Sequence, residues 1–253
     1  MKNKIIKISA VVVSAALLFG GLFLLFHDDI QVKIQEEKIK LFVPDFTLLE
    51  LPEQDNFNQN NSTYIAEKTE ENLTKQVQNL CDNFDNSVGW ICIPETEINY
   101  PVMYSGDNDF YLHRAVDGSY LRVGSIFLDY RCNSDFASRI NILYAHNMSD
   151  GSMFADVIKF IDSSYFDSHN YGWLSTPNAV YKIDFFSVSQ PENYDDFYDV
   201  NSDVNLWLYN LRANSFIWRN IGISEDDQFI SLSTCTGSEG SSRTILTGRI
   251  LEV

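Results

Sequence analysis

The chain has 253 residues, of which 45% are apolar, enough for one large domain or two small ones. Its 18 Lys plus Arg stand against 35 Asp plus Glu, giving a net charge of −17. This balance argues against nucleic acid as a partner, because phosphate binding needs clustered cations. It fits either a general solubility charge or the binding of basic peptides.

The N-terminus predicts a membrane anchor. Three lysines precede nineteen uncharged, mostly apolar residues at 8–26, and two aspartates follow. A helix of this length spans about 28 Å, close to the hydrocarbon core of a bilayer, and the lysines place the N-terminus in the cytoplasm. A cleaved signal peptide is the alternative, but the run is long for one and "LFLLFHDD" lacks a small-x-small site. We expect an uncleaved transmembrane helix within residues 1–29.

The middle of the chain predicts a linker and then a helix. Residues 30–63 are polar and broken, which favours a stalk. Residues 63–80 are expected to be helical, because Ser62 or Thr63 can cap the segment and apolar residues recur at helical spacing.

The rest of the chain has an all-β rhythm. Short β-branched and aromatic runs such as "VGWICI", "INILYAH" and "FISLSTC" are separated by Gly, Pro, Asn and Asp, which predicts a barrel or a sandwich. Helical inserts are expected at 153–161 and 204–215. We therefore expect one extracellular β domain at 64–253, with the N-terminal helical segment packed on it.

Cys235 ends the run "FISLSTC" before a loop of small and polar residues. Strand alternation puts it on the same face as Ser231 and Ser233, the more polar face, and leaves the other face for the core. A cysteine at a strand end beside a loop suits nucleophilic chemistry, and a buried structural cysteine is the alternative.

A thiol nucleophile needs a partner that favours the thiolate. His27 abuts the apolar run, His169 lies in a polar stretch interpreted as a loop, and His113 can cap or pack on a turn. His146 ends the strand "INILYAH", and strand ends are where rigid scaffolds present catalytic groups. His146 is therefore the preferred partner of Cys235, with a structural role as the alternative.

Arg243 opens "RTILTGRIL", the strand that returns from the Cys235 loop. If the two strands form a hairpin, Cys235 and Arg243 lie at the same end, where a guanidinium can donate to an oxyanion. A surface arginine is the alternative. Arg249 lies six residues further, roughly 20 Å away at about 3.3 Å per residue, too far for the same site.

We expect no metal or other cofactor. The stretch that begins at Asp199 opens like a calcium loop, but Val204 and Asn210 replace the glycine and glutamate that such a loop needs. No CxxC is present, which argues against zinc, while an even number of cysteines leaves disulfides open. The cysteines are Cys81, Cys92, Cys132 and Cys235.

Five features follow one another in the sequence: an apolar N-terminal run, a β domain, "YAHNMSDGSMF", "SLSTC" and an arginine that opens the last strand. The order resembles that of a class B sortase, a membrane-anchored cysteine transpeptidase of Gram-positive bacteria. The LxTC signature of sortases reads "LSTC" at 232–235, and residues 88–131 contain stretches characteristic of class B. The resemblance covers about residues 62–253, and Ser231 departs from the usual threonine.

The resemblance implies an eight-stranded β-barrel with an N-terminal helical segment and a helix in the loop between the sixth and seventh strands, about Gln190–Asp227. It implies that Cys235 is the nucleophile, His146 the general acid and base, and Arg243 the clamp for oxyanion and substrate. Four further residues fall where class B enzymes line the substrate groove: Asn108, Leu112, Tyr144 and Ser233.

The resemblance also implies a reaction and its partners. A sorting motif similar to Asn-Pro-x-Thr, near the C-terminus of a secreted protein, would be cleaved after threonine through a thioacyl-enzyme. The acyl group would pass to an amine of a peptidoglycan precursor outside the cell membrane. A pilin-polymerising sortase that joins subunits through lysine is the runner-up. A cysteine protease and a non-catalytic surface ectodomain with paired cysteines are more distant alternatives.

Overall fold

The chain divides into two compact units, residues 1–41 and 42–253. Residues 27–39 of the first unit form a helix. The computed structural model describes residues 27–49, 59–191, 197–237 and 242–253. Among these residues, no helix has both the length and the apolar character needed to span a membrane. The expected anchor at 8–26 lies outside the described residues.

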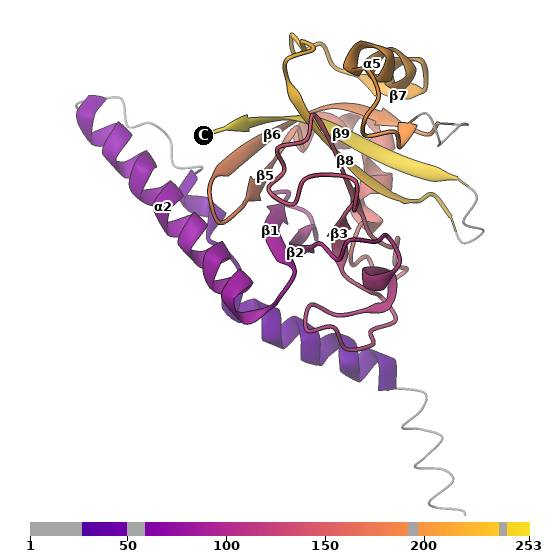
Figure 1. Ribbon diagram of the computed structural model, residues 1–253. Helices are drawn as coiled ribbons and strands as arrows, with labels where there is room; N and C mark the ends of the chain where they lie inside the picture. The colour runs from indigo at the N-terminus through magenta and orange to yellow at the C-terminus, as the bar shows by residue number, and fades with distance from the viewer. Residues whose placement is uncertain (1–26, 50–58, 192–196, 238–241) are drawn as a thin grey trace, which may run out of the picture. The chain divides into compact units, whose positions relative to one another are not determined.

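The second unit is mainly β, as the sequence predicts (Figure 1). Helices occur before the first strand and in the connections that follow β2, β4 and β6. The elements in chain order are η1 (Lys40–Phe42), η2 (Phe46–Leu49), α2 (Gln59–Asn83), β1 (Ser87–Cys92), β2 (Asn99–Met103), η3 (Phe110–His113), β3 (Ile126–Leu128), β4 (Ile140–Tyr144), η4 (Ala155–Ile161), α3 (Ser163–Ser168), β5 (Tyr171–Ser175), β6 (Val180–Ser189), α5 (Val204–Ala213), β7 (Ser215–Trp218), β8 (Gln228–Cys235) and β9 (Arg243–Glu252).

Eight of the strands close into a barrel. Their order is β5-β1-β2-β3-β4-β8-β9-β6, and the pairing of β5 with β6 joins the two ends. The pairs β2–β3 and β4–β8 are parallel and the others are antiparallel. Closure leaves no open edge on these strands, which confirms the expected eight-stranded barrel.

The short strand β7 was not expected from the sequence. The long strand β6 pairs along its first half with β5 and along its second half with β7, so one edge of β6 serves two partners. Its other edge pairs with β9 throughout. β7 belongs to the connection between β6 and β8, which folds back onto the barrel instead of extending into solvent.

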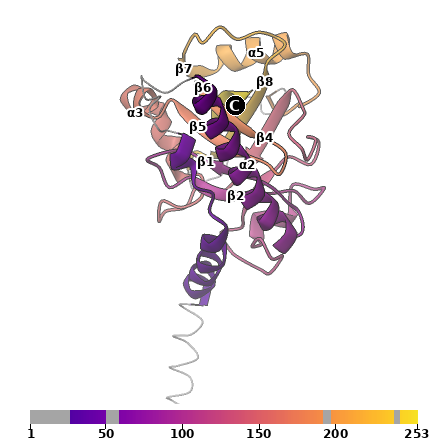
Figure 2. The same ribbon diagram turned by 90° about the vertical axis from the view of Figure 1, so that its left-hand side faces the viewer.

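The helix α2 covers part of the barrel wall (Figure 2). Its side chains Leu73, Val77 and Leu80 follow the i, i+4, i+7 spacing and are fully buried. α2 is longer at both ends than the expected 63–80. The segment before it also packs: Phe46 is buried, and Phe42 meets Phe84 edge-on at 5.3 Å between ring centroids.

Both helical inserts expected from the sequence are present, but their bounds or helix type differ from the expectation. The expected helix at 204–215 is α5, which Asp203 caps by accepting a hydrogen bond from the Leu206 amide at 3.0 Å. The segment expected at 153–161 is the 3-10 helix η4, and the separate helix α3 follows it after Asp162. Asp162 caps α3 through the amides of Ser164 and Tyr165, which starts a new helix there.

The connection between β6 and β8 is the expected Gln190–Asp227 loop, and α5 anchors it to the barrel. Trp207 of α5 is fully buried, and its indole packs on Phe229 of β8 with ring centroids 5.5 Å apart. Its Nε1 donates to the carbonyl of Phe197 at 3.0 Å. The loop therefore covers the outward face of β8.

We expect Trp207→Ala to lower the free energy of unfolding by about 3–5 kcal/mol, because it removes a large buried ring and leaves a cavity. Tyr209→Ala on the same helix should change it by less than about 0.5 kcal/mol, since that side chain is 72% exposed. Urea unfolding of both variants checks the prediction. Equal losses would mean that α5 does not anchor the loop in this way.

Candidate active site

The strands β4 and β8 bring a histidine and a cysteine to the same end of the barrel. The two strands are parallel neighbours with Tyr144 opposite Ser233. His146 and Cys235 each follow two residues later. The pairing continues past β4, because the Thr234 hydroxyl donates to the Ala145 carbonyl at 2.8 Å. The structure therefore places the imidazole and the thiol on adjacent strand ends, about 4.8 Å apart between backbones.

The antiparallel partner of β8 adds an arginine to this end. Cys235 and Arg243 are direct partners in the ladder between β8 and β9. Directly opposed side chains have their Cβ atoms about 4.5–5.5 Å apart. The hairpin expected from the sequence is confirmed. Arg249 pairs instead with Phe229 at the far end, and its guanidinium lies 3.3 Å from Asp184 and 3.8 Å from Asp227.

A backbone carbonyl orients the imidazole of His146. Nε2 of His146 lies 2.9 Å from the carbonyl oxygen of Leu112, in the segment that leaves η3. A carbonyl only accepts, so Nε2 carries the hydrogen and Nδ1 is left to exchange a proton. His113 stacks on the same ring, with centroids 5.5 Å apart, and its Nδ1 donates to the Arg122 carbonyl at 3.2 Å.

The backbone at Leu112 is fixed by a close approach of Gly124. The φ angle of Gly124 is +62°, and a Cβ there would lie 2.4 Å from the carbonyl oxygens of both Tyr111 and Leu112. Only glycine fits this position without moving those carbonyls. The orientation of His146 therefore depends on a glycine from a different turn of the chain.

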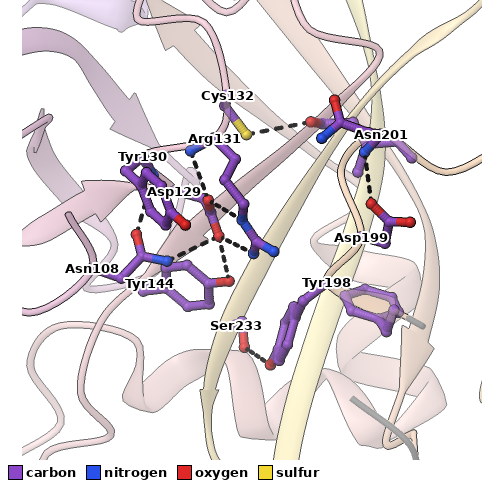
Figure 3. Close-up of polar contacts among 12 residues, drawn as sticks. Asn108, Asp129, Tyr130, Arg131, Cys132, Tyr144, Tyr198, Asp199, Asn201 and Ser233 are labelled. Carbon is purple, nitrogen blue, oxygen red and sulfur yellow. Dashed lines mark hydrogen bonds and ion pairs between the residues drawn. The ribbon is translucent and has the colours of Figure 1, made fainter. Parts of the chain in front are cut away.

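Three of the four residues expected along the substrate groove, Asn108, Tyr144 and Ser233, are shown in Figure 3 with their polar contacts. Asn108 and Tyr144 both donate to Asp129, at 3.1 and 2.9 Å. Leu112 contributes its carbonyl to His146. Ser233 is 2% exposed, and its Oγ lies 2.7 Å from the hydroxyl of Tyr198.

The more polar face of β8 is as deeply buried as the other face. Ser231 is fully buried, and its hydroxyl lies 3.0 Å from that of Thr247 on β9. Trp207 and Tyr198 from the Gln190–Asp227 loop cover this face. Cys235, at the strand end, is only half-buried. Strand alternation thus identified the face of Cys235 correctly but did not show that a loop covers it.

Comparison with known proteins identifies the family. The chain is 38% identical to the sortase B of Listeria monocytogenes over 154 residues, 58% of this chain and 62% of that protein. The solved structure of sortase B from Listeria monocytogenes is 33% identical and covers 68% of this chain and 97% of that chain, with a TM-score of 0.58. The chain belongs to the class B sortases. A Streptococcus pyogenes class B sortase involved in pilus biogenesis is 28% identical, with 69% of this chain and 97% of that chain covered and a TM-score of 0.64. No family model matches the chain.

The alignment with the curated Listeria protein thus spans less than two thirds of that relative's length. The solved structures, by contrast, are covered almost completely by residues of this sortase.

Two other cysteines of this sortase, Cys81 and Cys132, are poor candidates for the nucleophile. All four cysteines lie in the described part of the chain and none of them forms a disulfide, so the disulfide alternative is wrong. Burial raises the pKa of the Cys132 thiol to about 12. Burial, with the neighbouring Asp82, raises the pKa of Cys81 to about 11. Both stay protonated near neutral pH, where only a thiolate attacks.

Sequence reasoning missed three residues that contact the expected site. Asp129 and Arg131 lie in "FLDYR", and a charged residue directly after a buried strand was a usable signal for them. Tyr198 had no such signal, because its contact with Ser233 depends on how the Gln190–Asp227 loop folds back.

We expect Gly124→Ala to lower turnover by on the order of tenfold or more, because the added methyl group displaces the Leu112 carbonyl that orients His146. Gly118→Ala is the matched control: its φ is +77° but nothing lies within 4 Å of a Cβ there. Turnover of a sorting peptide by the two variants checks the prediction. If both variants lost turnover to a similar extent, the loss would be due to backbone strain and not to the Leu112 carbonyl.

Proposed function

We propose that this protein is a cysteine transpeptidase that cleaves a sorting motif of secreted proteins after threonine and transfers the protein to a cell-wall amine. The observation that carries the proposal is the meeting of Cys235, His146 and Arg243 at the ends of β4, β8 and β9. A nucleophile, a proton carrier and a rigid two-nitrogen donor are the groups that acyl transfer needs.

The chemistry follows from the positions of these groups. Nδ1 of His146 takes the proton of the Cys235 thiol. The resulting thiolate attacks the threonine carbonyl, and the new oxyanion accepts hydrogen bonds from Arg243. His146, with Nε2 held by Leu112, gives the proton on Nδ1 to the departing amine, and the peptide bond breaks. The thioester then reacts with an incoming amine. His146 takes the proton of that amine, and the thiolate leaves.

The proposed donor and acceptor follow from family membership. Membership of the class B sortases implies an Asn-Pro-x-Thr-like motif in the donor protein and an amine of a peptidoglycan precursor as the acceptor. The pilus-associated Streptococcus relative supports a second candidate, in which the acceptor is a lysine of a pilin subunit. The roles of Asn108, Leu112, Tyr144 and Ser233 as groove residues belong to the same proposal.

We also propose that the catalytic unit lies outside the cell membrane. The support is the lysine-flanked apolar run at 8–26, which suits a single-pass anchor with its N-terminus in the cytoplasm. The acidic charge of the chain fits a partner that presents a protonated amine.

A transfer assay tests the proposed function. The full-length protein in detergent is given a library of Asn-Pro-x-Thr peptides with a glycine amine, a diaminopimelate amine or a pilin-like lysine peptide. We expect cleavage after threonine and an amide product with one class of amine, and no product from Cys235→Ala. Preference for the lysine peptide would select the pilin alternative, and cleavage by Cys235→Ala would contradict the proposal.

Arg243→Lys should lower turnover by on the order of 10²–10³, because lysine keeps the charge but loses the rigid fork that reaches the oxyanion. Peptide affinity should fall much less, since this interaction strengthens as charge develops. Arg249→Lys, at the far end of β9, is the matched control and should stay near wild type. If Arg249→Lys lost most of its turnover while Arg243→Lys stayed near wild type, the assignment of Arg243 to the oxyanion would be wrong.

A further inference from the structure

A fully buried carboxylate that the proposed chemistry does not use lies beside the candidate site. Asp129 follows β3 directly, and its amide donates to the Ile142 carbonyl of β4 at 2.8 Å, which ties it to the barrel. Its side chain has no exposed surface. A buried carboxylate without partners is strongly unfavourable, so the groups around Asp129 must compensate for its loss of hydration.

Five hydrogen bonds converge on this carboxylate (Figure 3). Oδ1 accepts from the amide and Nε of Arg131, both at 2.9 Å. Oδ2 accepts from the terminal nitrogen of Arg131 at 2.6 Å, from the hydroxyl of Tyr144 at 2.9 Å and from the amide nitrogen of Asn108 at 3.1 Å. Burial alone would raise the pKa of Asp129, but the bonds from Arg131, Tyr144 and Asn108 outweigh it and hold that pKa below its ordinary value.

An ionised carboxylate only accepts, so it fixes the direction of each donor. The Asn108 side chain must turn its nitrogen toward Asp129, and its oxygen then accepts from the Tyr130 amide at 3.1 Å. The Tyr144 hydroxyl must likewise donate to Asp129. Tyr144 also packs on Phe127 and Tyr198, with ring centroids 5.5 and 5.6 Å apart.

The two side chains that Asp129 orients come from different segments. Asn108 lies in the connection before η3, and Tyr144 ends β4 opposite Ser233, two residues before Cys235. No direct hydrogen bond between Asn108 and Tyr144 is among the contacts of the described residues. Asp129 is therefore the group through which their relative placement is set.

We propose that Asp129 is a positioning residue that holds Asn108 and Tyr144 as one wall of the groove for the sorting peptide. The inference rests on the proposed function, because it assigns that wall to the donor peptide. Asp129 then affects peptide affinity through Asn108 and Tyr144, and it takes no part in the cleavage of the peptide bond. A purely structural carboxylate would affect stability without changing the affinity for peptide.

Kinetics of the full-length protein with its best library peptide test the proposal. Asp129→Asn keeps the shape but turns a donor toward Arg131, Tyr144 or Asn108. We expect KM to rise by about tenfold or more while kcat changes by less than about threefold, as uniform binding is lost. Asp156→Asn is the matched control: Asp156 is also buried and paired, with Lys159 at 2.6 Å, but lies on η4. It should leave KM unchanged.

Tyr144→Phe removes one donor and keeps the ring, so it tests the same idea with little risk to folding. It should also raise KM, and adding Asp129→Asn should raise KM by less than the product of the single effects, because the two residues act as a unit. Three outcomes would overturn the proposal. The first is a fall in kcat at constant KM, and the second is a double variant whose rise in KM equals the product of the single effects. The third is a rise in KM in Asp156→Asn as large as that in Asp129→Asn.

Peptide affinity measured on the Cys235→Ala background separates this proposal from the proposed function. Weaker binding by Asp129→Asn in that background supports the positioning role even if no transfer product forms. If wild type neither binds nor cleaves any library peptide, the proposed function fails. If peptide binds Cys235→Ala equally well with and without Asp129→Asn, only the positioning role fails.

Discussion

The parallel pairing of β4 with β8 is the constraint on which the site depends. It carries His146 and Cys235 to the same end of the barrel, and the β8–β9 hairpin adds Arg243. A slip of one residue would turn every side chain of a strand to its other face, so the register has to be fixed. Asn141 helps to fix it, because its buried amide donates to the Phe229 carbonyl at 3.2 Å and to the Ser138 carbonyl at 2.8 Å.

Around this pairing, neighbouring segments supply orientation rather than reacting groups. The Leu112 carbonyl sets which nitrogen of His146 is available, and Gly124 keeps that carbonyl in place. The burial of Asp129 is offset by Arg131, and burial together with the Asp129 charge raises the pKa of Tyr144, which keeps its hydroxyl a donor. The barrel thus fixes the strand ends, and the loops fix the side-chain directions there.

The β character of the domain and the pairing of Cys235 with Arg243 could be predicted because they follow from local rules. Those rules left both a barrel and a sandwich open, and only the resemblance to class B sortases implied the barrel. Strand alternation, turn residues and the length of a hairpin act over a few residues. The stacking of His113 on His146 and the contact of Tyr198 with Ser233 could not, because they depend on how connections fold back across the barrel. The strand β7 was missed for the same reason: its four residues are stabilised by β6, not by their own pattern.

Intact mass spectrometry of the full-length protein with a sorting peptide and no acceptor amine tests the central claim most directly. The account predicts one acyl adduct, the peptide up to its threonine, mapped to Cys235 and released by hydroxylamine, since a thioester is the only covalent state proposed. An adduct on Cys81, Cys92 or Cys132, or peptide cleavage with no hydroxylamine-sensitive adduct, would contradict it.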